Sequence, residues 1–431
     1  MEVHKFWRKA VPQKRQEVDV SRPTTVVEGS DLYMLVGKYN GNAGADDREG
    51  GAVDWGLLLV KGNVSGEEGS KRIQWNENKR LTGTLFEGEP NSLLLLTGGG
   101  GSGVKMKDNT LVFPVEATKK KLGQEEEAAG EKTVSLLIHT LDTSKNIKTW
   151  TLSKGMSDGG CRVPSVVEWK DKLMMMTACD DGRRRVYEIG DKEESWTEAL
   201  GTLSRVWGNK HEGDEKSVGS GFITATFGTG DEQKKVMLVT LPVYSKAEDE
   251  GEEKKRKEKG ELHLWLTDNT HIVDIGPVSG RDEDVAASSL LYKSGGSGTD
   301  GKKEELIALY EKKGDGETPS PSLWSVRLTA QLQRVKDVLA TWKKVDKQVS
   351  QLCPSSAAQV TSAGTACTAD KITAGLVGFL SGNFSDDTWR DEYLGVNATV
   401  KRGTKEGMPA DAAVVTGSSD GVTFRGAWAE W

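Results

Sequence analysis

Hydrophobic residues recur in short runs between about residues 22 and 327, separated by Gly, Asn and Asp. The clearest runs are "DLYMLVGKY", "GLLLVKG", "NTLVFPVEA", "VSLLIHTL", "KLMMMTA", "KVMLVTLPVYS", "ELHLWLTD", "SSLLYK", "ELIALYE" and "SLWSVRL". Runs rich in β-branched and aromatic residues, bounded by turn formers, indicate antiparallel strands. The pattern therefore predicts an all-β domain over residues 1–327.

The pattern changes after residue 327. Apolar residues then recur every three or four positions, at Leu328, Leu332, Val335, Leu339, Trp342, Val345, Val349 and Leu352. This spacing predicts a helix over 328–352 with one apolar face. Burying eight such side chains contributes roughly 12 to 24 kcal/mol, whereas ordering the backbone costs about 1 to 2 kcal/mol per residue. We therefore expect the helix to be packed between two domains.

Residues 353–373 are rich in Ser, Ala and Thr and are predicted to form a loop, and β-like alternation resumes over 374–431. A β-sandwich needs about 100 residues, so the last segment is expected to be the start of a truncated sandwich. Cys353 and Cys367 bracket the loop, and a disulfide is predicted there. Cys161 and Cys179 either pair, if they lie on neighbouring strands, or are isolated thiols. The triplets at Asn63, Asn383 and Asn397 fit N-glycosylation of a secreted protein.

Charge and composition exclude several classes of function. The chain has 431 residues, enough for two domains, and carries 58 basic and 65 acidic residues. This balance of charges gives no general attraction to nucleic acid. The sequence contains no run of about 18 apolar residues, so direct insertion into a membrane is not expected. The five histidines lack metal-ligand spacing, so neither a metal nor a cofactor is expected.

Two turns also repeat. "TSKNIKTW" and "IGDKEESW" both end in a hydroxyl residue followed by tryptophan, at Trp150 and Trp196. A separation of about 40 to 50 residues is typical of successive propeller blades.

Longer segments resemble one family. They are "SRPTTVVEGSDLYMLVGKYN", "SDGGCRVPSVVEWKDKL", "DDGRRRVYE", "SWTEALGTLSRVWGN", "LHLWLTDNTHIVDIGPVS", "AASSLLYK" and "TAGLVGFLSGNFSDDTWRDEYLGVNATV". Together they are similar to the trypanosomal trans-sialidase superfamily of surface glycoproteins, over nearly the whole chain from about residue 18. The resemblance implies a six-bladed sialidase-type β-propeller, a long connecting helix and a lectin-like β-sandwich, with the first blade incomplete here. The tryptophan turns then resemble degenerate Asp boxes with a structural role.

The resemblance also implies a site. Active members are retaining glycosidases in which a tyrosine, activated by a glutamate, attacks the sugar. The tyrosine position, directly before Ser-Ser, is Ala287 here, and Glu168 in "VVEWK" matches the partner glutamate. Tyr292, five residues after Ala287, is expected to face the other side of its strand and to be a packed aromatic.

Three arginines hold the sialic acid carboxylate in active members, because guanidinium groups match a carboxylate in charge and geometry. Arg183 in "DDGRRRVYE" matches the second arginine, and Glu311 in "IALYEKK" matches a glutamate that orients an arginine. Lys259 or Arg256 stands near the position of the third. The aspartate expected before "PTTVV" is Arg22.

The favoured hypothesis is a trans-sialidase-like surface glycoprotein that lacks the catalytic tyrosine. It would act as an adhesin or antigen at the cell surface or in secreted form, binding host glycans or proteins during host interaction and virulence. The alternative is an active exo-α-sialidase or trans-sialidase, and a third reading is a weak sialoside lectin.

Overall fold

The computed structural model describes most of the chain. The described residues are 20, 22–40, 56–67, 70–81, 93–119, 132–141, 149–190, 196–199, 203, 218–230, 233–244, 259–295, 304–314, 322–351, 380–385, 387–391, 393, 397–402, 414–418, 421–425 and 427–430. The described residues form mostly β-strands, with one long helix after them, so the predicted all-β architecture is confirmed. Each of the ten apolar runs quoted above overlaps a strand.

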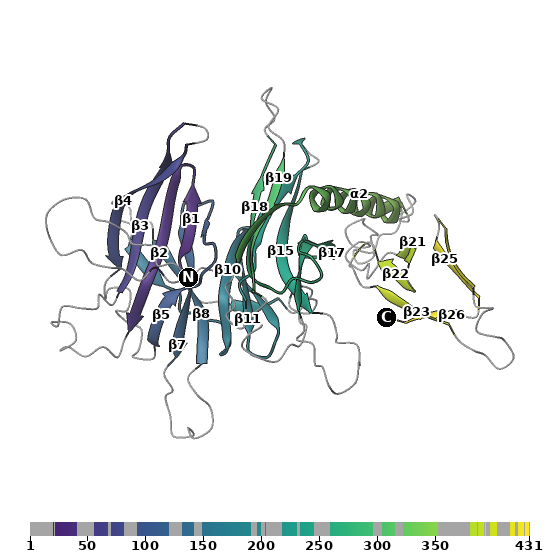
Figure 1. The fold of residues 1–431 in the computed structure, drawn as a ribbon, viewed down its shortest axis with the longest axis horizontal. Coiled ribbons are helices and arrows are strands. Elements are labelled where there is room, and N and C mark those ends of the chain that lie inside the picture. The colour runs from purple at the N-terminus through teal and green to yellow at the C-terminus, as the bar shows by residue number, and fades with distance from the viewer. Residues whose placement is uncertain are drawn as a thin grey trace, which may run out of the picture.

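The first sheet contains nine strands (Figure 1). They are β1 (Thr24–Glu28), β2 (Asp31–Asn40), β3 (Gly56–Ser65), β4 (Arg72–Leu81), β5 (Leu93–Gly98), β6 (Val104–Lys105), β7 (Leu111–Lys119), β8 (Lys132–Leu141) and β9 (Thr149–Leu152). The order is β4-β3-β2-β5-β7-β8-β9, with β1 beside β2 and β6 beside β7. The paired strands are antiparallel.

Three smaller antiparallel sheets follow in chain order. The first contains β10 (Cys161–Trp169), β11 (Lys172–Cys179), β12 (Arg184–Ile189) and β13 (Trp196–Glu198). The second contains β14 (Phe222–Phe227), β15 (Lys234–Tyr244), β16 (Gly260–Thr267) and β17 (Ile272–Pro277), and the third contains β18 (Val285–Lys293), β19 (Glu305–Lys312) and β20 (Ser322–Arg327). β10 packs against β7 and β8, β14 against β10, and β18 against β14 and β15. This face-to-face succession of meandering sheets is the arrangement of propeller blades.

The two repeated tryptophans both pack inside this region. Trp150 packs against the cluster that contains Phe113, with ring centroids 5.6 Å apart, and Trp196 lies 6.1 Å from the Tyr187 ring. Trp196 also lies against Gly155, where a Cβ would be only 2.3 Å from the indole. These contacts agree with the structural role expected of both tryptophans.

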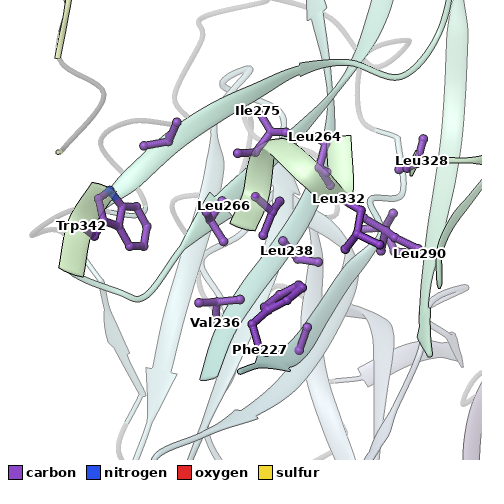
Figure 2. Packing of buried hydrophobic residues seen from close by; sticks show 14 of the residues in the cluster. Phe227, Val236, Leu238, Leu264, Leu266, Ile275, Leu290, Leu328, Leu332 and Trp342 are labelled. Carbon is purple, nitrogen blue, oxygen red and sulfur yellow. The ribbon is translucent and has the colours of Figure 1, made fainter. Parts of the chain in front are cut away.

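Helix α2 (Thr329–Gln351) begins and ends within one residue of the predicted helix. Its predicted face is buried at Leu332, Val335, Trp342 and Val345, in one cluster with residues of β14 to β19 (Figure 2). Tyr393 of the C-terminal region belongs to the same cluster. The helix therefore packs against the sheets before it and against the C-terminal region after it. This agrees with the expectation that the helix must be packed, because burying its apolar face alone does not offset the entropy lost in ordering its backbone.

A buried histidine marks the junction of these parts. The His271 ring, after β16, stacks on Trp342 with centroids 4.7 Å apart and meets the Tyr393 ring edge-on at 4.0 Å. Its Nδ1 lies 2.8 Å from Asp268 Oδ1, and Lys234 Nζ lies 2.8 Å from Asp268 Oδ2. Burial of the Asp268 carboxyl acts to raise its pKa, but His271 and Lys234 outweigh this, so the pKa lies well below its usual range.

Asp268→Asn is expected to lower the free energy of unfolding by about 3 kcal/mol at pH 7, because a mostly buried, hydrogen-bonded charge is removed. A depressed carboxyl pKa stabilises the native state above the unfolded value near 4, and this contribution is lost as the pH falls through the folded value. The difference between wild type and variant should therefore shrink between about pH 4 and pH 2. Urea unfolding at several pH values checks this, with the exposed Asp282→Asn as the matched control. A difference that stays constant with pH would contradict it.

The C-terminal described residues form two small sheets. β21 (Leu380–Ser385), β22 (Thr388–Asp391), β23 (Ala398–Arg402) and β26 (Ala427–Glu430) form one, and β24 (Val414–Ser418) and β25 (Gly421–Arg425) form the other. Within the described part of the chain, no helix has both the length and the apolar character needed to cross a bilayer.

The structure pairs Cys161 with Cys179, which are register partners on β10 and β11, in a disulfide with a Cα–Cα separation of 4.0 Å. The two alternatives left by the sequence are thus resolved in favour of pairing. Cys353 and Cys367 lie outside the described residues, so their predicted disulfide stays a prediction.

The three predicted glycosylation positions lie on or beside three different strands. Asn63 is half-buried on β3 and its Oδ1 accepts a hydrogen bond from Asn76, at 2.9 Å. Asn383 lies within β21, and Asn397 is exposed beside β23, where its Oδ1 accepts a bond from the Asp391 amide.

Candidate functional site

Two β-bulges lie close together at one end of the sheets. The register of β10 against β11 shifts between Arg162 and Ser165, and that of β18 against β19 shifts between Val285 and Ser288. Val163 lies in the first bulge and Ala287 in the second. Bulges often occur beside active sites, because the extra residue redirects a side chain.

Gly219, just before β14, lies between the two bulges. A Cβ built on Gly219 would lie 3.9 Å from Ala287 Cβ and 3.9 Å from Val163 Cγ1. The Ser288 amide donates to the Gly219 carbonyl at 2.9 Å, which holds β18 against this segment. Gly219 therefore lies close to both Ala287 and Val163.

An ion pair lies behind Val163. The Arg22 guanidinium makes a two-pronged contact with the carboxylate of Glu116, and its Nη2 also donates to the Gly99 carbonyl at 3.3 Å. The Val163 amide donates to the same Glu116 carboxylate. The Glu116 side chain is only 5% exposed, so these donors replace water around its charge.

The backbone is strained at the same place. Arg22 has φ 54° and Val163 has φ 50°, and left-handed backbone in a β-branched residue is rare. Such strain tends to persist at functional sites, where surrounding contacts over-determine it. We call Arg22, Glu116, Val163, Gly219 and Ala287 the central cluster.

The glycine-rich segment 98–103 packs closely against Arg22 of the central cluster and against Ser165. A Cβ on Gly98 would lie 2.2 Å from the Arg22 carbonyl, and one on Gly101 would lie 2.9 Å from Ser165 Oγ. Only glycine permits backbone to approach so closely.

The hydroxyl next to Ala287 is already engaged. Ser288 Oγ lies 2.9 Å from Thr240 Oγ1, which also accepts a bond from the Gly221 amide at 3.0 Å. Ser288 therefore ties β18 to β15 and is held by structural bonds.

The structure does not bring Glu168 to Ala287. Glu168 is opposite Leu173, near the β10–β11 turn, and its Oε1 accepts a bond from the Lys107 amide at 3.2 Å. Val163 lies five positions earlier on β10, which at about 3.3 Å per residue separates the two by roughly 16 Å. Val163, which like Ala287 lies near Gly219, has no carboxylate.

Arg183 is likewise displaced from the cluster. It is exposed in the β11–β12 turn, whereas the next residue, Arg184, is buried and donates from Nη1 to the Val218 carbonyl at 3.1 Å. Burial lowers the pKa of Arg184 to about 10. Val218 directly precedes Gly219, so Arg184 is the arginine nearest the central cluster from this strand.

Glu311 does lie beside Ala287. Because Val285 pairs with Lys312 and Ser288 with Tyr310, the half-buried Glu311 is opposite the bulge that contains Ala287. Lys259 is exposed before β16, and its Nζ donates to the Asp282 carbonyl at 2.7 Å, in the segment that leads into β18.

Two described tyrosines lie on the strands of the Ala287 bulge. Tyr310, the register partner of Ser288, is buried and donates its hydroxyl to Glu283 at 3.0 Å. The Tyr292 hydroxyl donates to Glu304 Oε1 at 2.8 Å and lies 3.2 Å from the Thr226 carbonyl, and its ring packs 5.1 Å from that of Phe227. This agrees with its expected role as a packed strand aromatic. The Glu168 side chain accepts a hydrogen bond from the Lys107 amide.

Sequence reasoning missed Val163, Glu116 and Arg184. The positive φ and the β-bulge at Val163 depend on how neighbouring strands align, so the local sequence does not indicate them. Arg184 could have been found, because strand alternation after the turn makes one of two consecutive arginines face inward.

Comparisons with known proteins agree with this architecture. A family model described as a BNR repeat-like domain matches residues 2–311, and one described as the trans-sialidase C-terminal domain matches residues 372–431. A sialidase of Trypanosoma cruzi is 34% identical over 348 residues, covering 78% of this chain and 27% of the relative. Sialidase 85-1.1 of the same organism is 33% identical over 414 residues, covering 94% of this chain and 48% of the relative.

A solved structure also matches. Trypanosoma rangeli sialidase in complex with sialic acid superposes with a TM-score of 0.66 and 32% identity, covering 92% of this chain and 57% of that chain. The chain spans about half or less of the length of the two Trypanosoma cruzi relatives.

The fold and the matching models define the class, a sialidase-type β-propeller with a C-terminal domain. The chain belongs to the trypanosomal sialidase and trans-sialidase family. The implied six blades stay a prediction.

Proposed function

We propose that this chain is a sialidase-fold surface protein that does not hydrolyse sialosides and acts by binding host glycans or host proteins. The observation that carries the proposal is the methyl group of Ala287, which lies beside Gly219, at the position where active members are expected to have a tyrosine. A methyl group cannot attack the sugar, and valine cannot take up a proton.

The charges of the central cluster support the same proposal. Arg22 is neutralised by Glu116, so it is not available to a sialic acid carboxylate without breaking a bond to a buried acid. Arg184 is buried behind Val218 and would offer little contact to a ligand at Ala287. We expect sialyllactose to bind with an affinity no better than roughly millimolar.

Turnover of a fluorogenic α-sialoside tests the proposal. We expect a rate on the order of a million-fold below that of an active sialidase, because the nucleophile of a catalytic unit is absent. Trypanosoma rangeli sialidase is the positive control, and its variant without the nucleophile sets the background. A rate above this background would instead support the second candidate function, an exo-α-sialidase or trans-sialidase, which the 31 to 34% identity with named sialidases favours.

The binding role needs a separate measurement. The purified chain is expected to bind mammalian cells equally before and after enzymatic removal of their sialic acid, since the central cluster offers little to a carboxylate. Calorimetry with sialyllactose tests the lectin reading, and micromolar affinity would contradict the proposal. Absence of binding to any cell type would contradict the adhesin role.

A further inference from the structure

β20 is an exposed strand on the outside of its sheet. In the described chain it pairs with β19 on one side only, within a sheet of three strands, whereas the two preceding sheets have four. Its first four residues are exposed, with Leu323 70% and Trp324 47% accessible to solvent. The β18–β20 sheet lies beside α2 in Figure 1.

The unpaired edge lacks the features that usually protect edge strands. Natural edges are short, charged, or interrupted by proline or bulges, because a long apolar edge pairs with other chains. β13 has only three residues, and β17 ends in Gly276 and Pro277. β20 reads "SLWSVR", with its single charge at the last position.

The direction of the free backbone groups follows from the ladder. The Leu328 amide donates to the carbonyl of Leu306, and these two residues are opposite each other when the β19–β20 register is extended by one. Because bonded pairs alternate in an antiparallel ladder, Trp324 and Val326 also bond inward. Leu323, Ser325 and Arg327 therefore direct their amides and carbonyls toward the free edge.

We propose that β20 pairs antiparallel with β20 of a second copy of this chain, centred on Ser325. This register places Leu323 opposite Arg327 of the other copy and Ser325 opposite its own equivalent. Leu323, Ser325 and Arg327 of each copy then each face a residue with which they exchange two main-chain hydrogen bonds, which gives roughly six bonds in all. A dimer centred on Trp324 would form only about four such bonds.

The side chains of β20 also favour pairing with a second copy of the chain. Opposite residues of an antiparallel pair share a face, so each Trp324 would meet a Val326, an aromatic and β-branched pair that stabilises sheets. A two-fold axis through Ser325 makes this contact twice. The strand is thus complementary to itself, which a symmetric dimer requires.

Sedimentation velocity of the full chain tests the dimer. We expect a reversible shift from the 46.8 kDa monomer toward twice that mass at roughly micromolar concentrations. Ser325→Pro removes an outward amide while sparing the inward bonds, and should weaken the dimer at least about tenfold. Ser325→Ala keeps the amide and is the matched control. Leu323→Lys, which puts a charge on the edge, should weaken the dimer without changing the backbone.

Cross-linking tests the register. Ser325→Cys should give a disulfide-linked dimer on mild oxidation, because residues in a bonded pair lie about 5.5 Å apart at Cα. Leu323→Cys should not, since two copies of that position would lie roughly 13 Å apart. A wild type that stays monomeric overturns the proposal, as does stronger cross-linking through position 323. A monomer whose β20 amides resist hydrogen exchange would mean that another segment of the same chain covers the strand, which also overturns it.

Discussion

Trp342→Ala is expected to lower the free energy of unfolding by about 3 to 5 kcal/mol, among the largest effects of any single substitution in the chain. Trp342 is fully buried and stacks on His271 within the cluster that joins α2 to β14–β19 (Figure 2). Truncation removes the apolar contacts and leaves a cavity between elements that are fixed by their own sheets, so little collapse can fill it.

The measurement is urea unfolding followed by far-ultraviolet circular dichroism, because the substitution itself alters tryptophan fluorescence. Lys344→Ala, on the exposed side of the same helix, is the matched control and should change stability by less than about 0.5 kcal/mol. If Trp342→Ala cost less than about 1 kcal/mol, the helix would not be the brace between the two parts of the chain.

Arg22→Met is expected to cost about 3 kcal/mol, because it leaves the carboxylate of Glu116 buried with the Val163 amide as its remaining donor. Glu116→Gln should cost less, since the Arg22 side chain is 35% exposed and water can solvate it. The double variant should recover much of the loss, because replacing both members of a buried pair is often nearly neutral.

A double-mutant cycle by thermal and urea unfolding measures this coupling. Lys172→Met, in the exposed pair of Lys172 with Glu188, is the control and should cost less than about 1 kcal/mol. Equal losses for Arg22→Met and Glu116→Gln would contradict the asymmetry. Additive losses in the double variant would show that the two charges do not stabilise each other.

The candidate site was only partly predictable from sequence. Ala287 and Glu311 were predicted as neighbours of the site, and the fold places them opposite each other on β18 and β19. Glu168 and Arg183 were predicted with them, but they lie near the far end of β10 and in an exposed turn. Bulges, turn lengths and positive φ values change which residue faces inward, and they are set by contacts between distant segments.

The sequence by itself determined the strands, the helix and the absence of a hydroxyl at position 287, because hydrophobic periodicity and residue identity are local properties. Only the tertiary structure decided that Gly219 lies close to Val163 and Ala287, that Arg22 pairs with Glu116, and that Cys161 bonds to Cys179. It also left the edge of β20 exposed among the described strands. These features join residues on separate strands or sheets, so they depend on how strands align and pack.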